Sequence, residues 1–234
     1  MKTTLLIFTL NEVNGMKQIM PKIKREWIDQ ILVVDGGSTD DKFEYEKEAG
    51  YDVIIQKKKG LRHSYIEAMD HITGDVMITF SPDGNSIAEL IPPLVEKLKE
   101  GYDMVIVSRY AQGAKSYDDD IVTAFGNWLF TKLINLIYRS KYTDAMVMFR
   151  GYKTEIIKAL DIDKDSSYVV EEKLFNTTVG CEPLISIRAA KRHLKCVDIA
   201  GDEPSRIGGK RKLQIIRWGL AYMFEVFREI FIWR

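Results

Sequence analysis

The chain is poor in cysteine and carries no excess of charge of either sign. Its 234 residues include two cysteines, Cys181 and Cys196, too few for a disulfide framework or for the spaced cysteine and histidine ligands of a zinc site. The 34 basic residues balance 34 acidic ones, so the overall charge does not favour a nucleic-acid partner. Two reduced thiols are typical of a cytoplasmic protein, and we expect that location.

Long hydrophobic runs and a secretion signal are also lacking. The apolar run Leu5–Phe8 is too short for the core of a secretory signal and has the length of a first strand. No uninterrupted apolar stretch reaches the roughly 18 residues of a membrane-spanning helix. Hydrophobic residues make up 46% of the chain and charged residues 29%, which is ordinary for a folded globular protein. We therefore expect one sizeable domain with a soluble body.

The first half of the sequence alternates strand and helix patterns. Apolar runs of strand length lie at Thr4–Thr9, Gln30–Asp35, Asp52–Gln56, Val76–Phe80 and Met104–Ser108. Helical patterns lie between them, at residues 15–24, 39–49, 61–72 and 87–99, the last of them capped by Asn85-Ser86. This alternation predicts an α/β fold, with a mostly parallel sheet and helices on both faces.

The second half of the sequence is less regular. We expect helices at residues 121–138, 154–160 and 171–179, a strand-like run at 145–152, and strands at 183–189 and 194–199. A glycine-rich, basic loop follows at 201–212. The expected organisation is a domain over residues 1–200, a mobile basic loop over 201–212 and a C-terminal amphipathic helix over 213–234.

The C-terminal helix has a narrow polar stripe and a wide apolar arc. The stripe consists of Gln214, Arg217, Glu225, Arg228 and Glu229, which recur at three- and four-residue steps. Such a helix would lie in a membrane interface, with the basic loop before it at anionic headgroups. It would equally pack against the domain or against a second subunit, and at this point both interpretations stay open.

Two strand ends carry an isolated aspartate among small, turn-forming residues. Asp35 begins the turn Asp35-Gly36-Gly37-Ser38, and Asp83 lies within Ser81–Asn85. In an open α/β sheet, ligands bind beyond the carboxyl ends of the strands. Asp35 and the glycines after it would hold a base and a ribose there, or they would form an ordinary capped turn.

Asp83 and Asn85 offer two oxygen ligands from one turn, which suits a hard divalent cation such as Mg²⁺. The alternative is an Asx-type turn that caps the following helix. Two further segments reach the same edge of the sheet. Thr9–Glu12 adds a carboxylate after the first strand, and Lys57–Arg62 adds cations that would neutralise a diphosphate or that simply belong to a solvated turn.

Five short motifs follow one another along the chain: Asn11-Glu12, Val34–Ser38, Ser81–Asp83, Ser108–Tyr110 and Arg206–Gly209. In this order, between Thr4 and Leu213, the chain resembles family 2 glycosyltransferases, and most of all their dolichyl-phosphate mannose synthase branch. The resemblance implies a GT-A (Rossmann-like) fold, a nucleotide-diphosphate sugar donor, a Mg²⁺ or Mn²⁺ ion and inversion at the anomeric carbon. It also implies a lipid-phosphate or glycan acceptor at the cytoplasmic face of a membrane, and it is compatible with a homo-oligomer.

Carried over by position, the resemblance assigns a role to each motif. Asp83 and Asn85 would hold the metal, and Arg109 would face the sugar or the acceptor phosphate. Arg206 and Lys210 would lie on a mobile loop over the diphosphate. The nucleotide-binding residues would be Thr9, Asn11, Glu12, Asp35, Gly36, Gly60 and Arg62, of which the last two belong to the segment after the third strand.

The chain departs from the family pattern in two places. Ser81 replaces the first aspartate of the usual Asp-x-Asp metal turn, which removes one ligand charge. After Ser108–Tyr110, synthases that act on polyprenyl phosphate usually carry arginines, whereas this chain has Asp118-Asp119-Asp120. Three carboxylates would repel a phosphate acceptor. They would alternatively bind a cation, or form the negative first turn of the helix at residue 121, and we favour the capping interpretation.

The acceptor decides whether the reaction needs a general base. A phosphate nucleophile is already ionised, whereas a sugar hydroxyl needs a carboxylate within hydrogen-bond reach. The candidates are Asp144 and the pair Glu171-Glu172, although either glutamate would equally be a helix-dipole partner. Asp83 and Arg109 complete the expected catalytic set, and the three histidines form no spaced cluster.

Two other functions are compatible with the sequence. A nucleotidyltransferase would share the sheet and the metal turn, but it would usually carry a glycine-rich, basic loop after the first strand, which Thr9–Gly15 lacks. A catalytically silent module would use the same scaffold to hold a nucleotide or to recruit a partner to membranes. Ser81 is the residue that supports this second alternative.

Overall fold

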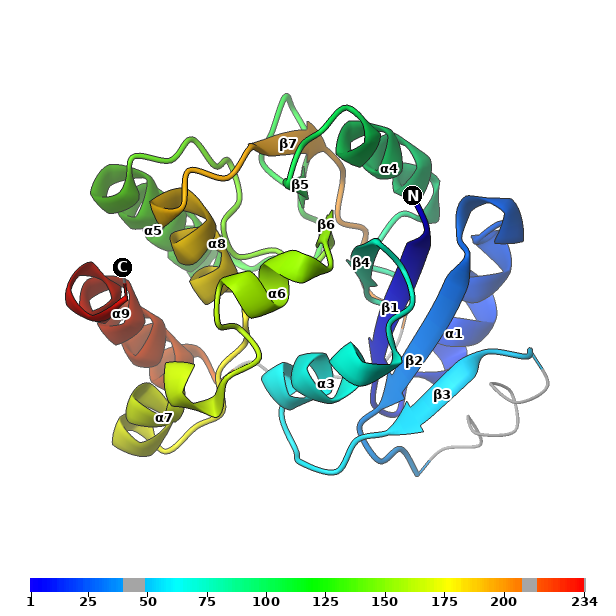
Figure 1. Ribbon diagram of the computed structural model, residues 1–234, viewed down its shortest axis with the longest axis horizontal. Coiled ribbons are helices and arrows are strands. Elements are labelled where there is room, and N and C mark those ends of the chain that lie inside the picture. The colour runs from blue at the N-terminus through cyan, green and yellow to red at the C-terminus, as the bar shows by residue number, and fades with distance from the viewer. Residues whose placement is uncertain (40–48, 208–213, 234) are drawn as a thin grey trace.

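The protein is built on one seven-stranded mixed sheet. The computed structural model describes residues 1–39, 49–207 and 214–233. Within these residues the strand order is β3-β2-β1-β4-β6-β5-β7 (Figure 1). The strands are β1 Thr3–Thr9, β2 Gln30–Asp35, β3 Asp52–Ile55, β4 Val76–Phe80, β5 Met104–Ser108, β6 Arg150–Lys153 and β7 Cys196–Ala200. Among them β6 alone runs antiparallel to its neighbours, so the expected mixed, mostly parallel sheet is confirmed.

Burial on both faces explains the continuous apolar runs of the strands. Every residue of β1, β4 and β5 is buried, as expected for strands that helices cover on both sides. The strands expected in the first half of the chain agree with the observed bounds to within one residue. In the register of β1 with β2, Thr9 pairs with Asp35, so these two strand ends lie side by side.

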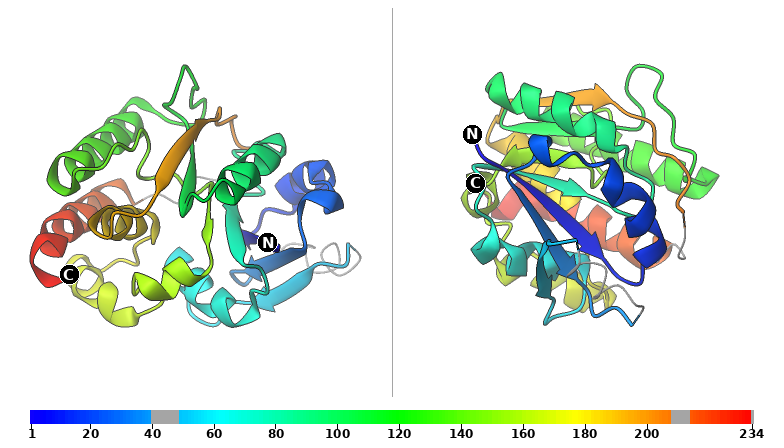
Figure 2. Two further views of the ribbon diagram at one scale, coloured as in Figure 1. Left: turned by 45° about the horizontal axis from the view of Figure 1, so that its top comes forward. Right: turned by 90° about the vertical axis from the view of Figure 1, so that its right-hand side faces the viewer.

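Helices cover both faces of the sheet (Figures 1 and 2). They are α1 Val13–Ile19, α3 Leu61–Ala68, α4 Ile91–Lys99, α5 Ile121–Tyr138, α6 Glu155–Ala159, α7 Val169–Phe175, α8 Glu182–Lys191 and α9 Ile215–Ile232. Consecutive side chains of a strand point to opposite faces, and two residues of β6 show what lies on each. Arg150 donates from Nη1 to Oγ of Ser186 in α8 at 3.0 Å. A Cβ on Gly151 would instead lie 2.2 Å from Leu94 of α4.

The strand expected at residues 183–189 is wrong, because this segment is the middle of helix α8. Every residue from Glu182 to Ala190 is buried, so the segment shows no polar face. A short apolar run without a clear period cannot be told from a buried strand. Pro183 lies in the first turn of the helix, where a missing N–H breaks no helical hydrogen bond.

Several boundaries also differ from expectation. Helix α4 starts at Ile91, after a 3-10 helix at Ala88–Leu90, so Asn85-Ser86 does not cap it. Only the last part of the strand-like run 145–152 belongs to β6. Helix α7 covers residues 169–175 instead of 171–179, and α1 ends at residue 19 with a 3-10 turn after it. Most of the helix expected at 39–49 lies outside the described residues.

Helix α9 turns the C-terminal part of its polar stripe towards the protein, whereas Gln214 and Arg217 are exposed. Glu225 and Glu229 are fully buried, and Arg228 is 9% exposed. The helix contacts α5, α7 and α8. Glu229 forms an ion pair with Arg188 of α8 at 3.0 Å, and Arg228 pairs with Glu171 of α7. The ion pairs of Arg228 and Glu229 therefore hold helices together, and the packing of α9 against the domain is the interpretation that the structure confirms.

The apolar arc of α9 faces outward, and a similar surface continues on α5. Exposed fractions reach 89% for Ile121 and 59% for Phe125 of α5, and 78% for Ile216 of α9. The helices meet through the rings of Phe130 and Tyr222, whose centroids are 6.1 Å apart. We call this surface the α5–α9 face. Its exposed residues are Ile121, Val122, Phe125, Trp128, Leu136, Ile215, Ile216, Leu220, Phe227, Ile230, Phe231 and Ile232.

Helix α5 is long and apolar enough to cross a membrane, judged by length and composition alone, and within the described ranges it is the one helix of this kind. Asn127 and Lys132 interrupt its apolar run, which is why the sequence shows no uninterrupted apolar stretch of spanning length there.

Candidate active site

A cavity of about 330 Å³ lies beyond the carboxyl ends of the parallel strands. Glu12 follows β1, Asp83 and Asn85 follow β4, Arg109 follows β5, and Arg206 comes from the segment after β7. All of these are residues that the sequence predicts for the site, and the structure brings them to one cavity. A cavity of this size accommodates a small ligand.

The turn that carries Asp83 is held between α1 and the segment after β7. The Oδ1 atom of Asp83 accepts a hydrogen bond from the backbone N–H of Asn85 at 3.1 Å, which forms the expected Asx turn. A Cβ on Gly15 of α1 would lie 2.4 Å from the carbonyl oxygen of Pro82. On the other side, the N–H of Ile207 donates to the carbonyl oxygen of Asp83 at 2.7 Å. Backbone packing thus places the carboxylate at the cavity.

Asp83 and Asn85 present oxygens that fit a divalent cation. The Oδ1 atom of Asn85 is buried and has no hydrogen-bond partner among the residues that the structure describes. A buried acceptor without a donor costs free energy, and a hard cation would satisfy it. Across the described ranges, no three His, Cys, Asp or Glu side chains are placed to hold a metal on their own. The cation would therefore also rely on phosphate oxygens of a bound ligand, as Mg²⁺ commonly does.

Arg206 lies between two carboxylates at this end of the cavity. Its Nη1 atom is 3.6 Å from Oδ2 of Asp83, and its Nη2 atom is 3.0 Å from Oδ2 of Asp118. Asp118 also accepts a hydrogen bond from Nδ2 of Asn85 at 3.1 Å. Burial alone would raise the pKa of Asp118, but Arg206 and Asn85 hold it below its ordinary value. Asp118 was expected in a helix cap, and the structure places it beside the predicted metal ligands instead.

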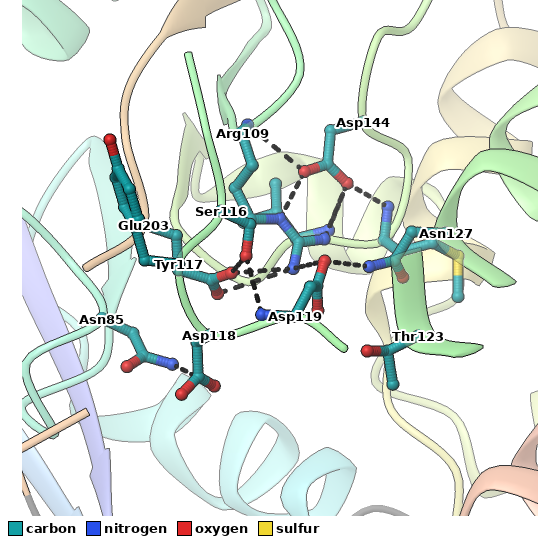
Figure 3. A network of polar contacts seen from close by, with 12 residues as sticks. Asn85, Arg109, Ser116, Tyr117, Asp118, Asp119, Thr123, Asn127, Asp144 and Glu203 are labelled. Atoms are coloured by element: carbon teal, nitrogen blue, oxygen red, sulfur yellow. Dashed lines mark hydrogen bonds and ion pairs between the residues drawn. The ribbon is translucent and has the colours of Figure 1, made fainter. Parts of the chain in front are cut away.

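Arg109 is surrounded by three carboxylates (Figure 3). Its guanidinium forms two bonds to Asp144: the Nε atom of Arg109 lies 2.6 Å from Oδ2 of Asp144, and the Nη2 atom lies 3.1 Å from Oδ1. The Nη1 atom faces Glu203 at 3.4 Å and Asp119 at 3.6 Å. Burial would raise the pKa of Asp144, but the guanidinium and the N–H of Met146 hold it below its ordinary value. Asp144 therefore positions Arg109 as an ionised partner, which corrects the expectation of a general base.

Glu203 is a carboxylate of the cavity that contacts Arg109. It lines the cavity, and burial raises its pKa, an effect that Arg109 and the Ser116 hydroxyl partly offset. A carboxylate whose pKa is raised is better matched to a general base near neutral pH. The sequence interpretation missed this residue because it followed the glycines and cations of 201–212. The available signal was Asp202-Glu203 directly after β7, the same strand-end position that marks the predicted aspartates.

The three carboxylates of Asp118–Asp120 have different roles. Asp120 caps α5, because its Oδ1 atom accepts from the N–H of Thr123 at 2.8 Å and the Thr123 side chain bonds back to the Asp120 backbone. The capping prediction is therefore confirmed for Asp120. Asp119 instead accepts from Nδ2 of Asn127 at 3.0 Å and faces Arg109.

The predicted nucleotide-binding residues after β1 and β2 form a rim that continues from the cavity. Asp35 accepts at Oδ1 from the backbone N–H of Gly37 at 3.0 Å. Asn11, which has a positive φ of 56°, accepts at Oδ1 from the N–H of Thr39 at 2.8 Å. The first hydrogen bond shapes the turn after β2, and the second ties this turn to the turn after β1. The rim consists of Thr9, Asn11, Glu12, Asp35 and Gly36.

Arg62 and Glu172 lie away from this rim, where they join α3 to α7. Arg62 is 4% exposed and donates from Nε and Nη2 to the two carboxylate oxygens of Glu172, at 2.7 and 2.6 Å. Its Nη1 atom bonds Asp165 at 2.6 Å. Gly60, at the start of α3, packs against Thr178. Arg62 and Glu172 neutralise each other's charge. Arg62 is therefore not placed at a diphosphate, and Glu172 is not placed at an acceptor, which corrects both expectations.

Glu171 is also placed away from the cavity. Its side chain is fully buried and forms an ion pair with Arg228 of α9. A carboxylate enclosed between two helices cannot reach an acceptor, so this glutamate holds the fold. Lys210, expected beside Arg206 at the diphosphate, lies outside the described residues.

The family model described as "Glycosyl transferase family 2" matches residues 4–161. Among curated proteins, the glycosyltransferase AglJ of Haloferax volcanii is 26% identical, over 94% of this chain and 69% of its own length. The dolichol-phosphate mannosyltransferase of Pyrococcus furiosus is 28% identical, over 99% of this chain and 63% of its own length. An undecaprenyl-phosphate 4-deoxy-4-formamido-L-arabinose transferase of Klebsiella pneumoniae is 27% identical, over 68% of this chain and 51% of its own length.

Solved structures show the same fold. Glucosyl-3-phosphoglycerate synthase from Mycobacterium tuberculosis, in complex with Mn²⁺, uridine diphosphate and phosphoglyceric acid, superposes with a TM-score of 0.68. It is 16% identical in sequence, and the match covers 96% of this chain and 78% of that one. A likeness at this level of identity concerns the fold of the sheet and its helices.

Proposed function

The chain belongs to glycosyl transferase family 2, in the dolichol-phosphate mannosyltransferase branch, and from this membership we propose that it transfers a sugar from a nucleotide-diphosphate sugar at the cavity beyond β1, β4, β5 and β7. The observation that carries the proposal is the pair of oxygen ligands on Asp83 and Asn85, in contact with Arg206. An oxygen pair next to a guanidinium suits a metal-bound diphosphate.

Each part of the site has a role in this reaction. The rim from Thr9 to Gly36 would hold the nucleoside. Asp83 and Asn85 would hold Mg²⁺ or Mn²⁺, which supplies charge that stabilises the leaving diphosphate. Arg206 would add a second positive charge to the same diphosphate. Arg109 would orient the acceptor on the other side of the anomeric carbon, which gives inversion.

The acceptor that fits best is a lipid phosphate. The names of two relatives specify dolichol-phosphate and undecaprenyl-phosphate as the compounds on which they act. The α5–α9 face begins next to the cavity, because Asp118–Asp120 lead directly into α5 and Trp218 of α9 lines the cavity. A lipid chain on this face would reach the cavity with its phosphate end. Since a phosphate is already ionised, no general base would be needed.

A hydroxyl acceptor is the second candidate, and Glu203 is the observation that favours it. Three carboxylates around Arg109 offset its positive charge and weaken its attraction for a phosphate. Glu203 would then remove the proton of the hydroxyl. Glu203→Gln would abolish transfer to a hydroxyl but leave transfer to a lipid phosphate largely intact.

We also propose that the protein works at the cytoplasmic face of a membrane and touches it through the α5–α9 face. The exposed apolar residues of this face would enter the headgroup region. The division into a domain over 1–200, a loop over 201–212 and a helix over 213–234 stays part of this proposal, although residues 208–213 lie outside the described ranges.

Calorimetry with nucleotide sugars tests the proposed function. UDP-, GDP-, CMP- and dTDP-linked sugars are titrated into the protein with and without Mn²⁺ or Mg²⁺, and transfer to a polyprenyl phosphate is measured for each nucleotide sugar that binds. We expect metal-dependent binding of one of them, which Asp83→Asn abolishes while the protein stays folded. If no nucleotide sugar binds with metal present, the proposal fails. Binding without any transfer would support the catalytically silent module.

A further inference from the structure

We propose that Asp118 supplies the second carboxylate for the divalent cation at Asp83 and Asn85, and that Arg206 occupies this carboxylate pair when the cation is absent. The inference rests on the proposed function, because it concerns the same metal site. It adds a residue from the loop before α5, far along the chain from the turn that follows β4.

Asn85 connects the two carboxylates. Its backbone N–H bonds Oδ1 of Asp83 at 3.1 Å, and its side-chain Nδ2 bonds Oδ2 of Asp118 at 3.1 Å. Its Oδ1 atom is the buried oxygen without a partner among the described residues. The carboxylates of Asp83 and Asp118 are therefore both hydrogen-bonded to Asn85, whose own side-chain oxygen is the third oxygen of the group. Oxygen ligands of this kind bind Mg²⁺ or Mn²⁺ either directly or through a water molecule that the ion retains.

A positive charge already lies between the two carboxylates. The guanidinium of Arg206 is 3.6 Å from Asp83 and 3.0 Å from Asp118. It balances one of two negative charges, whereas a divalent cation balances both. Since a cation at Asp83 and Asn85 would meet this guanidinium as a like charge, Arg206 must move when the ion binds. Arg206 and the metal are therefore competitors in the absence of a diphosphate.

Asp118 also accounts for the serine at position 81. Ser81 lines the cavity two residues before Asp83, but its hydroxyl carries no negative charge. A carboxylate from the loop before α5 restores the second charge that one or two carboxylate ligands give to a Mg²⁺ site. An aspartate at position 81 would make Asp118 redundant.

Mn²⁺ binding to the nucleotide-free protein, followed by electron paramagnetic resonance, tests this inference. We expect Asp118→Asn to raise the Kd for Mn²⁺ about tenfold. Asp119→Asn is the matched control, because it removes the same charge one residue away and should change the Kd less than about twofold. Ser81→Asp combined with Asp118→Asn should restore the affinity. Arg206→Gln should lower the Kd several-fold, because the competing cation is removed.

The outcomes separate this inference from the proposed function. The inference is overturned if Asp118→Asn binds Mn²⁺ like the unmodified protein, if Asp119→Asn weakens binding equally, or if Arg206→Gln weakens it. If the unmodified protein binds no Mn²⁺, or if Asp83→Asn has no effect, the metal site of the proposed function fails as well. Should Asp118→Asn fail to fold, Arg206→Gln still decides, because a gain of affinity cannot come from unfolding.

Discussion

Arg109 and Asp144 form a buried, two-point ion pair, with Nε to Oδ2 at 2.6 Å and Nη2 to Oδ1 at 3.1 Å. Asp144 is fully buried and Arg109 is 8% exposed. A bidentate pair of this kind fixes both the position and the plane of the guanidinium. The remaining guanidinium nitrogen, Nη1, points to Asp119 and to Glu203, which lines the cavity (Figure 3). Asp144 therefore determines how Arg109 is presented at the cavity.

Asp144→Asn should destabilise the protein and impair transfer. Removing one partner of a buried pair costs about 3 kcal/mol of unfolding free energy. The pKa of Asp144 lies below its ordinary value, so this stabilisation is present at neutral pH and is lost as the pH falls through the pKa of the folded state. Urea unfolding measures the loss. Glu100→Gln, in a surface pair with Lys97 on α4, is the control and should change little. Equal unfolding midpoints for Asp144→Asn and the unmodified protein would refute the prediction.

Glu172→Gln should affect stability and leave the rate of transfer per folded molecule nearly unchanged. The glutamine cannot neutralise the buried Arg62, so we expect a loss of about 2 kcal/mol in urea unfolding. Asp165→Asn removes the more exposed partner of the same arginine and should cost less. A hundredfold fall in kcat with an unchanged unfolding midpoint would instead restore Glu172 as the general base.

The protein should lose stability as the pH rises from about 5 to 7, through Glu171 and Glu225. Burial raises the pKa of Glu171 from 4.5 to about 7, and burial and Glu171 raise the pKa of Glu225. The groups around them are Arg228 and Glu229 of α9, Arg188 of α8, and Tyr138 of α5, so three carboxylates face two guanidiniums. Between the unfolded and folded pKa values, the folded state keeps a proton that the unfolded state releases, so a higher pH favours unfolding.

Melting temperatures between pH 5 and pH 8 measure this effect. Glu225→Gln removes the excess negative charge, so it should flatten the pH dependence and raise the melting temperature at pH 8. Glu96→Gln, on the surface of α4 beside Lys99, should keep the slope of the unmodified protein. An unchanged slope in Glu225→Gln would show that the buried carboxylates do not hold this proton.

The α5–α9 face should mediate binding to membranes. Phe125, Trp128 and Ile216 are 59%, 54% and 78% exposed. Each would contribute about 1 kcal/mol on entering the headgroup region. Replacing all three with serine should therefore reduce sedimentation with anionic phospholipid vesicles by more than tenfold. Ile55→Ser, on the edge strand β3, is the control and should have no effect. If the triple variant still sediments but a dimer becomes a monomer, the face is a subunit interface.

Periodicity and strand-end chemistry predicted much of this protein, and particular residues show why. The runs that end at Asp35 and Phe80 are parallel strands buried on both sides, and such strands have continuous apolar sequences. Helix α8 was mistaken for a strand for the same reason, because burial on all sides removes the polar face that marks a helix. The polar stripe of α9 was recognised, but the stripe alone did not show whether it faces solvent or other charges.

The local sequence by itself determined the strands, the turns at their carboxyl ends and the presence of Asp35, Asp83 and Arg109 there, because hydrophobic runs and turn residues act over a few positions. Only the tertiary structure decided which charges meet. It paired Arg62 with Glu172, enclosed Glu171 beside Arg228, and brought Asp118 to Asn85. Electrostatic partners are chosen by distance in space, and helices that pack together join residues whose separation in the sequence carries no signal.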